Sequence, residues 1–218
     1  MVKVICPCEH NSILNQFVAE IRDVNIQSDS MRFRRNMERI GEIFAYEISK
    51  TLKYNTQEIT TPLGVAQIPL PAEQPVLATI LRAGLPFHNG LLNYFDKGGN
   101  AFISAYRKHH KDGKFTIQME SVSGPVIDDK TLIIADPMLA TGSSIVLTYK
   151  ELLLKGKPKH THIVTIVACV DGIEYIKRNL SRENITIWAA AIDLELTAQA
   201  YIVPGLGDAG DLAFGTKE

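Results

Sequence analysis

Residues 131–144 join an apolar run to a loop of small and hydroxylated residues, and they read Thr131-Leu132-Ile133-Ile134-Ala135-Asp136-Pro137-Met138-Leu139-Ala140-Thr141-Gly142-Ser143-Ser144. The run from Thr131 to Ala135 predicts a buried β-strand, which Asp136 ends before the loop opens a helix. Backbone N–H groups at a helix start, with Thr and Ser hydroxyls beside them, form a compact cradle for a monophosphate. We therefore expect a phosphate-binding loop; the alternative is an ordinary strand, loop and helix with a Ser/Thr cap.

The same loop argues against hydrolysis of a nucleoside triphosphate, because it lacks the Gly-Lys-Ser/Thr of a Walker A motif. Asp136 stands immediately before the cradle and suits a partner for hydroxyl groups on the phosphorylated molecule. A ribose 5′-phosphate fits both features.

Short apolar runs alternate with helix-like stretches around this loop. The runs are Val76 to Leu81, Ala101 to Tyr106, Thr131 to Ala135, His162 to Val170 and Ile185 to Ile192, and the helix-like stretches are Leu85 to Phe95, Ser143 to Leu154 and Ile173 to Leu180. This pattern predicts an α/β fold with a largely parallel central sheet and helices on both faces. No repeat or linker divides the chain, so we expect one domain over residues 1–218.

Ligands of such sheets bind at the carboxyl ends of the strands, where four segments of this chain are expected to lie. They are Leu81-Arg82-Ala83-Gly84, Tyr106-Arg107, Asp136 to Ser144, and Tyr201 to Gly215. We expect Arg82 and Arg107 to share this edge with the cradle rather than to be unrelated surface residues. Lys108 to Lys114 should form a polar loop that is mobile without ligand.

The residues before the sheet predict an N-terminal arm over 1–27, a helix and a hairpin. A capping segment and an apolar stripe predict the helix from Met31 to Leu52. Its first turns carry a basic cluster of Arg32, Arg34, Arg35 and Arg39. We interpret this cluster as a solvated or subunit-facing surface whose charge an acidic neighbour or ligand compensates, rather than as an effector site. Ile59 to Pro71, with three prolines, predicts a hairpin excursion.

The composition excludes several classes of protein. The 218 residues are 45% hydrophobic and 22% charged, which excludes a disordered chain, and 23 Lys+Arg against 24 Asp+Glu give no basic excess for nucleic acid. No apolar run is long enough for a membrane span and no signal peptide is recognised, so we expect a cytoplasmic protein. Cys6 and Cys8 fit a mobile terminus better than a metal site with His10, and Cys169 reads as a core residue.

Three motifs in the right order resemble the uracil phosphoribosyltransferases. Asp136 to Gly142, Asp-Pro-Met-Leu-Ala-Thr-Gly, is similar to their phosphoribosyl-diphosphate signature, in which Asp-Pro stands where most related transferases carry two acidic residues. Ile80 to Leu85 resembles their diphosphate loop, and Tyr201 to Asp211, Tyr-Ile-Val-Pro-Gly-Leu-Gly-Asp-Ala-Gly-Asp, resembles their uracil-binding hood. Phe33 to Glu47 also matches their early helix. The resemblance covers roughly Ser28 to Thr216.

This resemblance implies a type I phosphoribosyltransferase fold and the conversion of uracil and 5-phospho-α-D-ribose 1-diphosphate to UMP and diphosphate in pyrimidine salvage. It puts ribosyl-diphosphate contacts at Arg82, Arg107, Asp136, Pro137, Met138, Leu139, Ala140, Thr141, Gly142, Ser143, Ser144 and Asp208, uracil contacts at Ile202, Gly207, Asp208 and Ala209, and catalytic roles at Arg107 and Asp208. The hood would span residues 200–216. The cofactor would be Mg²⁺, held mainly by the diphosphate rather than by a protein site. A homo-oligomer and a GTP effector are implied, and no nucleic-acid or membrane partner.

Two features depart from the family pattern, and two other functions remain as alternatives. Ser143 stands where the family usually has Gly, and Lys108-His109-His110-Lys111 is more basic than the corresponding family run. The alternatives are an RNA-binding regulator, for which only the arginine cluster offers a basic face, and a transferase for another base. Gly205 to Gly210 satisfies Gly-x-Gly-x-x-Gly, but too few residues follow it for a dinucleotide-binding unit.

Overall fold

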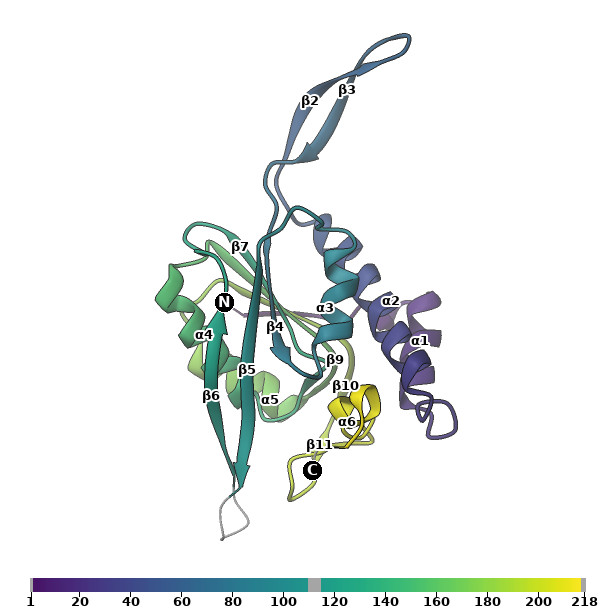
Figure 1. Ribbon diagram of the computed structural model, residues 1–218, viewed down its shortest axis with the longest axis vertical. Coiled ribbons are helices and arrows are strands. Elements are labelled where there is room, and N and C mark those ends of the chain that lie inside the picture. The colour runs from purple at the N-terminus through teal and green to yellow at the C-terminus, as the bar shows by residue number, and fades with distance from the viewer. Residues whose placement is uncertain (1, 110–114, 217–218) are drawn as a thin grey trace.

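The computed structural model describes residues 2–109 and 115–216, and the side chains of these except for residues 106–109 and 115–118. The described residues form an eight-stranded central sheet in the order β1-β10-β9-β7-β4-β5-β6, with the short β8 paired to β9 (Figure 1). The strands are β1 Lys3–Ile5, β4 Val76–Leu81, β5 Asn100–His109, β6 Phe115–Ser123, β7 Thr131–Ala135, β8 Met138–Leu139, β9 His160–Cys169 and β10 Ile185–Asp193. Among the described strands of this sheet only β5 and β6 pair antiparallel, so the prediction of a largely parallel sheet is confirmed.

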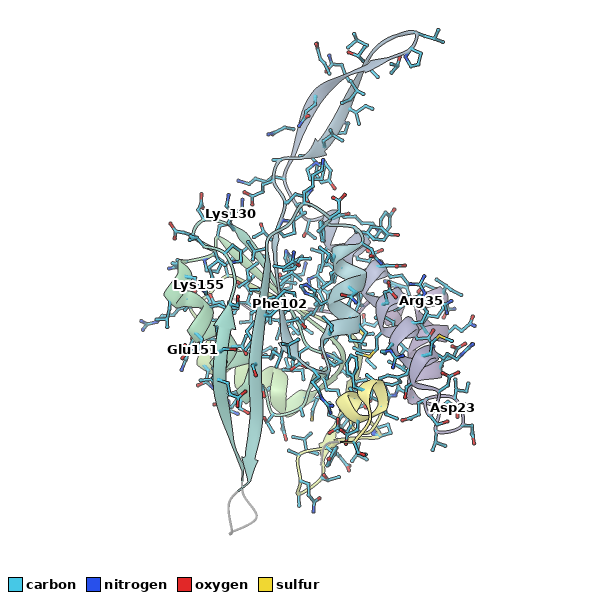
Figure 2. The ribbon with its side chains drawn as sticks, in the orientation of Figure 1. Asp23, Arg35, Phe102, Lys130, Glu151 and Lys155 are labelled. Atoms are coloured by element: carbon cyan, nitrogen blue, oxygen red, sulfur yellow. The ribbon has the colours of Figure 1, made fainter. Side chains whose placement is uncertain are left out.

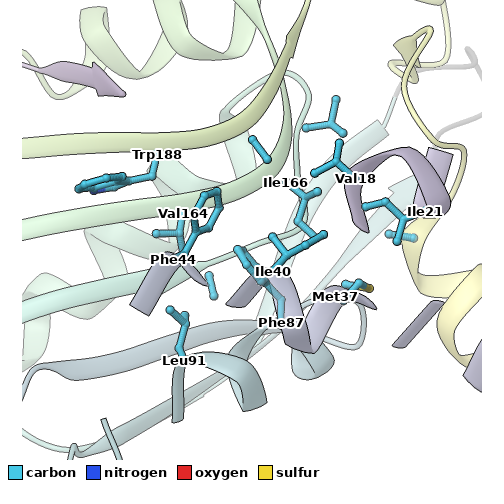
Figure 3. Close-up of a cluster of buried hydrophobic side chains, with 14 of the residues drawn as sticks. Val18, Ile21, Met37, Ile40, Phe44, Phe87, Leu91, Val164, Ile166 and Trp188 are labelled. Carbon is cyan, nitrogen blue, oxygen red and sulfur yellow. The ribbon is translucent and has the colours of Figure 1, made fainter. Parts of the chain in front are cut away.

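Helices cover both faces of this sheet, as the sequence predicts. The helices α1 Ile13–Arg22, α2 Ser30–Ser49 and α3 Leu85–Leu92 lie on one face, and α4 Ser143–Leu152 and α5 Val170–Asn179 lie on the other (Figure 1). Phe44 of α2 packs edge-on against Phe87 of α3, with ring centroids 5.7 Å apart (Figure 3). Val164 of β9 packs in the same hydrophobic core as Phe44 and Phe87. Its neighbour Ile163 belongs to the core on the other face of the sheet, beneath α4 and α5. One apolar strand therefore serves two cores, which explains its unbroken hydrophobic sequence.

Helix α2 begins where its capping segment predicts. The Asp29 side chain accepts a hydrogen bond from the Arg32 backbone N–H at 3.0 Å, and Phe33, Met37 and Ile40 are buried at the spacing of one helical face. The helix ends at Ser49, slightly before the predicted Leu52.

Two arginines of the α2 cluster, Arg32 and Arg35, form ion pairs with carboxylates. Arg32 forms a two-pronged ion pair with Glu20 of α1, and Arg35 pairs with Glu38 at 2.7 Å. Hydrogen bonds from Arg32 and Asn36 lower the pKa of Glu20 to about 2. The acidic neighbour expected from the sequence is thus present beside Arg32.

The N-terminal residues are part of the fold, so the expectation of a mobile terminus is wrong. Strand β1 pairs in parallel with β10, and the 3₁₀ turn Pro7–Glu9 leads to α1. The Cys6 thiol donates to the Ala190 carbonyl at 3.5 Å, and no group of three or more His, Cys, Asp or Glu residues within 2–109 and 115–216 is placed to hold a metal ion. Cys169 is fully buried, as expected. Strand β1 was not predicted because its three residues are too few to show the alternation typical of a strand.

The residues after Tyr106 continue as a strand, which corrects the expectation of a loop beginning at Lys108. Strand β5 runs to His109 and forms an antiparallel hairpin with β6, in which Arg107 stands opposite Ile117. Arg107 therefore lies within its strand rather than at its end. Of the loop expected to be mobile, residues 110–114 lie outside the described residues. The alternation of apolar and polar residues from Phe115 to Met119 is the strand signal that was missed.

A second hairpin projects from the body of the molecule. It consists of β2 Tyr54–Thr61 and β3 Gly64–Pro71, a separate two-stranded sheet whose side chains stand apart from the rest of the chain (Figure 2). The predicted hairpin excursion is confirmed, although it begins five residues earlier than Ile59. Leu63 at its tip is fully exposed. Across the described part of the chain, no helix is both long and apolar enough to cross a membrane.

Candidate active site

The loop that is expected to bind phosphate, residues 136–144, is called the phosphate loop below. It follows β7 and is hydrogen-bonded to β9. The Asp136 backbone N–H donates to the Val164 carbonyl at 3.1 Å, and the Pro137 carbonyl accepts from both Ile166 and Val167. The short strand β8 then pairs with β9. These bonds fix the backbone from Asp136 to Leu139 to the sheet, so the rest of the loop starts from a rigid support.

Two glycines let helix α4 begin close to helix α5. Gly142 adopts φ +79°, and a Cβ there would lie 2.7 Å from the Gly172 carbonyl oxygen. A Cβ on Gly172 would clash with the Ala140 carbonyl oxygen. The Thr141 and Ser143 hydroxyls lie 2.8 Å apart, and Ser143 is the first residue of α4. The loop thus presents backbone N–H groups and hydroxyls at a ten-residue helix start, the arrangement that favours a phosphate.

The C-terminal segment forms a small hood beside this loop. It comprises the two-stranded sheet of β11 Glu195–Leu196 and β12 Ile202–Val203, followed by the short helix α6 Ala209–Phe214, so it begins before the predicted residue 200. Gly205 and Gly207 adopt positive φ angles of +54° and +90°. The Asp208 carboxylate caps α6, because its Oδ1 accepts from the backbone N–H groups of Gly210 and Asp211 at 2.9 and 3.1 Å.

The hood is tied to the N-terminal helices by two arginines. Arg22 of α1 contacts both oxygens of Asp193 at 3.0 and 2.9 Å, and Asp193 Oδ2 also accepts the Gly205 backbone N–H at 2.8 Å. Arg34 of α2 donates to the Ala213 carbonyl at 2.6 Å, near the end of α6. These contacts fix the hood's position relative to the sheet.

The phosphate loop and the hood line one cavity of about 590 Å³ at the carboxyl ends of the strands. From the loop it is lined by Asp136, Pro137, Met138, Leu139, Ala140, Thr141, Gly142 and Ser144, and from the hood by Gly207, Asp208 and Ala209. Eleven residues singled out in the sequence are therefore brought together. Three others, Arg82, Ser143 and Ile202, do not line the cavity; Ile202 is buried in the core beneath the hood.

Arg82 belongs to the diphosphate-loop segment, and its side chain reaches the hood. Its Nη2 lies 3.4 Å from Asp211 Oδ1 and 3.2 Å from the Gly215 carbonyl oxygen, and its neighbour Ala83 lines the cavity. The Arg82 side chain remains 40% exposed. The Arg107 side chain lies outside the described part of the chain, whereas Ala105 on the same strand lines the cavity.

The sequence matches the model of the uracil phosphoribosyltransferase family over residues 8–216. This chain belongs to that family. A uracil phosphoribosyltransferase from Porphyromonas gingivalis is 58% identical to it over 209 residues, which are 96% of each chain. A uracil phosphoribosyltransferase from Pyrococcus furiosus is 37% identical over 210 residues, covering 95% of this chain and 88% of the relative. The AQ2163 protein of Aquifex aeolicus shares the fold, with a TM-score of 0.85 over 99% of this chain at 24% identity.

Some residues that line this cavity were not among the site residues predicted from the sequence. They are Ile80, Ala83, Ala105, Ile145, Gln199, Ala200, Tyr201, Gly210 and Asp211. Tyr201, Gly210 and Asp211 lie inside the hood motif, which was the signal that could have found them. Ala200 falls within the hood predicted at residues 200–216, and Ile80 and Ala83 fall within the diphosphate-loop segment. Gln199 carries no such signal; it lies in a turn closed by the Ala200 N–H bond to the Thr197 carbonyl.

The cavity offers hard oxygen ligands for a divalent cation. The carboxylates of Asp136, Asp208 and Asp211 line it, although no group of three His, Cys, Asp or Glu side chains among the described residues is close enough to hold a metal by itself. Mg²⁺ keeps several waters and binds through one or two carboxylates together with substrate phosphates. The donor set therefore fits a Mg²⁺ ion that arrives with a diphosphate.

Proposed function

We propose that this chain transfers the 5-phosphoribosyl group of 5-phospho-α-D-ribose 1-diphosphate to uracil, which yields UMP and diphosphate in pyrimidine salvage. The observation that carries the proposal is that the phosphate loop and the hood line the same cavity. Membership of the uracil phosphoribosyltransferase family supports the same reaction. The loop would take the phosphorylated sugar and the hood would take the base.

The 5′-phosphate would be held by the backbone N–H groups of Ala140 to Ser144 and the hydroxyls of Thr141 and Ser144. The loop's attachment to β9 supports this assignment, because a rigid donor set loses little entropy when it binds an anion. Asp136, at the end of β7, would accept hydrogen bonds from the ribose hydroxyls. Pro137, Met138 and Leu139 form the wall between these two positions.

The departing diphosphate requires positive charge, because the ribose C1′ becomes oxocarbenium-like while negative charge gathers on the leaving group. Arg82 and Arg107 would supply that charge from the neighbouring strands β4 and β5. Bound Mg²⁺ would neutralise the diphosphate oxygens further. Asp208 uses Oδ1 to cap α6, so its Oδ2 would face the ribosyl diphosphate or a metal-bound water.

Uracil would be read mainly by backbone groups of the hood. The positive φ of Gly207 and the small side chain of Ala209 expose peptide groups to the cavity. Cytosine presents a donor where uracil presents an acceptor, and such a mismatch costs about 1–3 kcal/mol for each buried group left unpaired. Ile202 would contribute through the core that supports the hood rather than by contact with the base.

The decisive test is UMP formation from uracil and the ribosyl diphosphate, with cytosine and hypoxanthine as competing bases. We expect turnover with uracil only and loss of turnover when Mg²⁺ is removed. Release of diphosphate with another base would overturn the assignment of the substrate. The same assay with GTP tests an effector, and the molecular mass in solution tests the homo-oligomer that we propose for this cytoplasmic enzyme.

A further inference from the structure

A second cavity, of about 500 Å³, lies at the amino-terminal ends of the parallel strands. Lys3 begins β1 and His160 begins β9, and both line it, so the cavity is at the edge of the sheet opposite the candidate active site. The base of the β2–β3 hairpin completes the wall through Lys53. Its volume falls in the range of sites for small molecules.

His162, which lines this cavity, is an uncharged imidazole. The Trp188 indole N–H donates to His162 Nδ1 at 3.0 Å. An indole can only donate, so Nδ1 is the acceptor and the neutral imidazole carries its proton on Nε2. His162 is only 3% exposed, and its burial lowers its pKa to about 3. His160 lies beside it with ring centroids 4.5 Å apart, and burial lowers the pKa of His160 as well.

The rim carries positive charge from three separate segments. Lys3 comes from β1, Lys53 from the turn after α2, and Lys159 from the residue before β9. Among the lining residues, Glu73 is the only carboxylate, and it pairs with Lys159. Lys3 and Lys53 thus give the rim an excess of two positive charges over neutral imidazole and amide groups.

We propose that this cavity binds a compound bearing a dianionic phosphate group, with Lys3 and Lys53 as its counter-charges. An ammonium group binds phosphate as a point charge without a fixed geometry, which suits a site assembled from three segments. The His162 imidazole and the Asn184 amide provide neutral donors for the remaining oxygens. The cavity is larger than a phosphate ion, so a phosphate ester is the expected occupant.

Trp188 makes this site directly measurable, because it is the only tryptophan of the chain and it lines this cavity. Titration with glucose 6-phosphate should change the tryptophan emission saturably, whereas glucose should not. Inorganic phosphate should bind more weakly; equal binding would support the phosphate site and assign free phosphate as its occupant. The double variant Lys3→Gln/Lys53→Gln should lower the affinity about tenfold or more, because it removes two charged partners.

The matched control is Lys150→Gln/Lys177→Gln, which removes two lysines of helices α4 and α5 outside the cavity lining. This control should keep the affinity of the unaltered chain, and all three proteins should keep UMP formation. Calorimetry with the candidate active site saturated by UMP covers the case in which binding leaves the emission unchanged. Absence of binding by both methods, or equal weakening in both double variants, would overturn the proposal.

Discussion

Gly142 holds the phosphate loop in a backbone conformation that other residues reach only with strain. An L-residue at positive φ costs about 1–2 kcal/mol, and a Cβ at this position would also lie 2.7 Å from the Gly172 carbonyl oxygen. We expect Gly142→Ala to lower the melting temperature and to raise the KM for the ribosyl diphosphate several-fold more than the KM for uracil. Ser143→Gly is the control and should behave like the unaltered enzyme. An unchanged KM in Gly142→Ala would remove this loop from the site.

Asp208 combines a structural and a chemical role that one substitution can separate. Asparagine caps a helix about as well as aspartate, so Asp208→Asn should keep α6 folded while it removes the negative charge. We expect kcat to fall by a factor on the order of 10² with little change in uracil affinity. Asp208→Ala should in addition lose about 1 kcal/mol of stability with the cap. Loss of uracil binding in Asp208→Asn at an unchanged kcat would reverse the assignment.

Ala209 and Ile202 test where the base binds. Ala209 lines the cavity, whereas Ile202 is buried in the core beneath it. Ala209→Leu should therefore block uracil sterically, and Ile202→Val should be tolerated at a cost of about 0.5–1.5 kcal/mol in stability. Uracil affinity and the free energy of unfolding, measured together, separate the two effects. Normal uracil affinity in a folded Ala209→Leu variant would contradict the position that we assign to the base.

Helix α1 and the hood are joined through one buried carboxylate. Asp193 is 8% exposed and connects the Arg22 guanidinium to the Gly205 backbone N–H. We expect Asp193→Asn to raise the KM for uracil and to lower the free energy of unfolding by about 1–3 kcal/mol, since a charged hydrogen-bonded group loses its partner. Glu174→Gln removes an exposed pair with Lys177 and should change neither. A stability loss without any change in KM would show that the hood does not depend on this connection.

The ion pair between α1 and α2 predicts a response to acid. Arg32 and Asn36 lower the pKa of Glu20 from its ordinary value of 4.5 to about 2. A lowered pKa means that the stabilisation is present above pH 4.5 and is lost as the pH falls toward 2. We expect Glu20→Gln to lower the melting temperature at pH 7 but to change it little at pH 2. Glu47→Gln, at an exposed pair with Lys50, is the matched control. Equal effects of Glu20→Gln at both pH values would contradict this origin.

Elements with a long or regular pattern could be predicted from the sequence, and short ones could not. The apolar residues at helical spacing from Phe33 to Ile48 predict α2, and the short apolar runs predict β4, β7, β9 and β10. Helix α1 had a usable signal in Leu14, Val18 and Ile21, but it was obscured by the unusual Cys-Pro-Cys segment before it. Strands β1, β11 and β12 have two or three residues each, which is too few for a period. Their positions depend on tertiary contacts.

The arrangement of the whole candidate site followed from one rule, because parallel strands bring their carboxyl ends to the same edge. This rule, with the resemblance of three motifs, predicts that the loop at Asp136 and the hood at Asp208 lie together. The contributions of Ala105 and Gln199 required the structure, since nothing in their local sequence distinguishes them. The second cavity was also beyond prediction, because its lysines come from segments that the chain pattern does not relate.

Because β1 pairs with β10, the first strand of the chain can fold only after most of the chain has been synthesised. Cys6, just after β1, bonds to Ala190, 184 residues further along the sequence. At ordinary translation rates the ribosome needs roughly ten to forty seconds to cover that distance. During this time the first strand has no partner, so the nascent chain must keep its N-terminus unpaired. A ribosome-bound chain that stops before Ile185 should therefore leave residues 3–5 open to a protease that spares the finished protein.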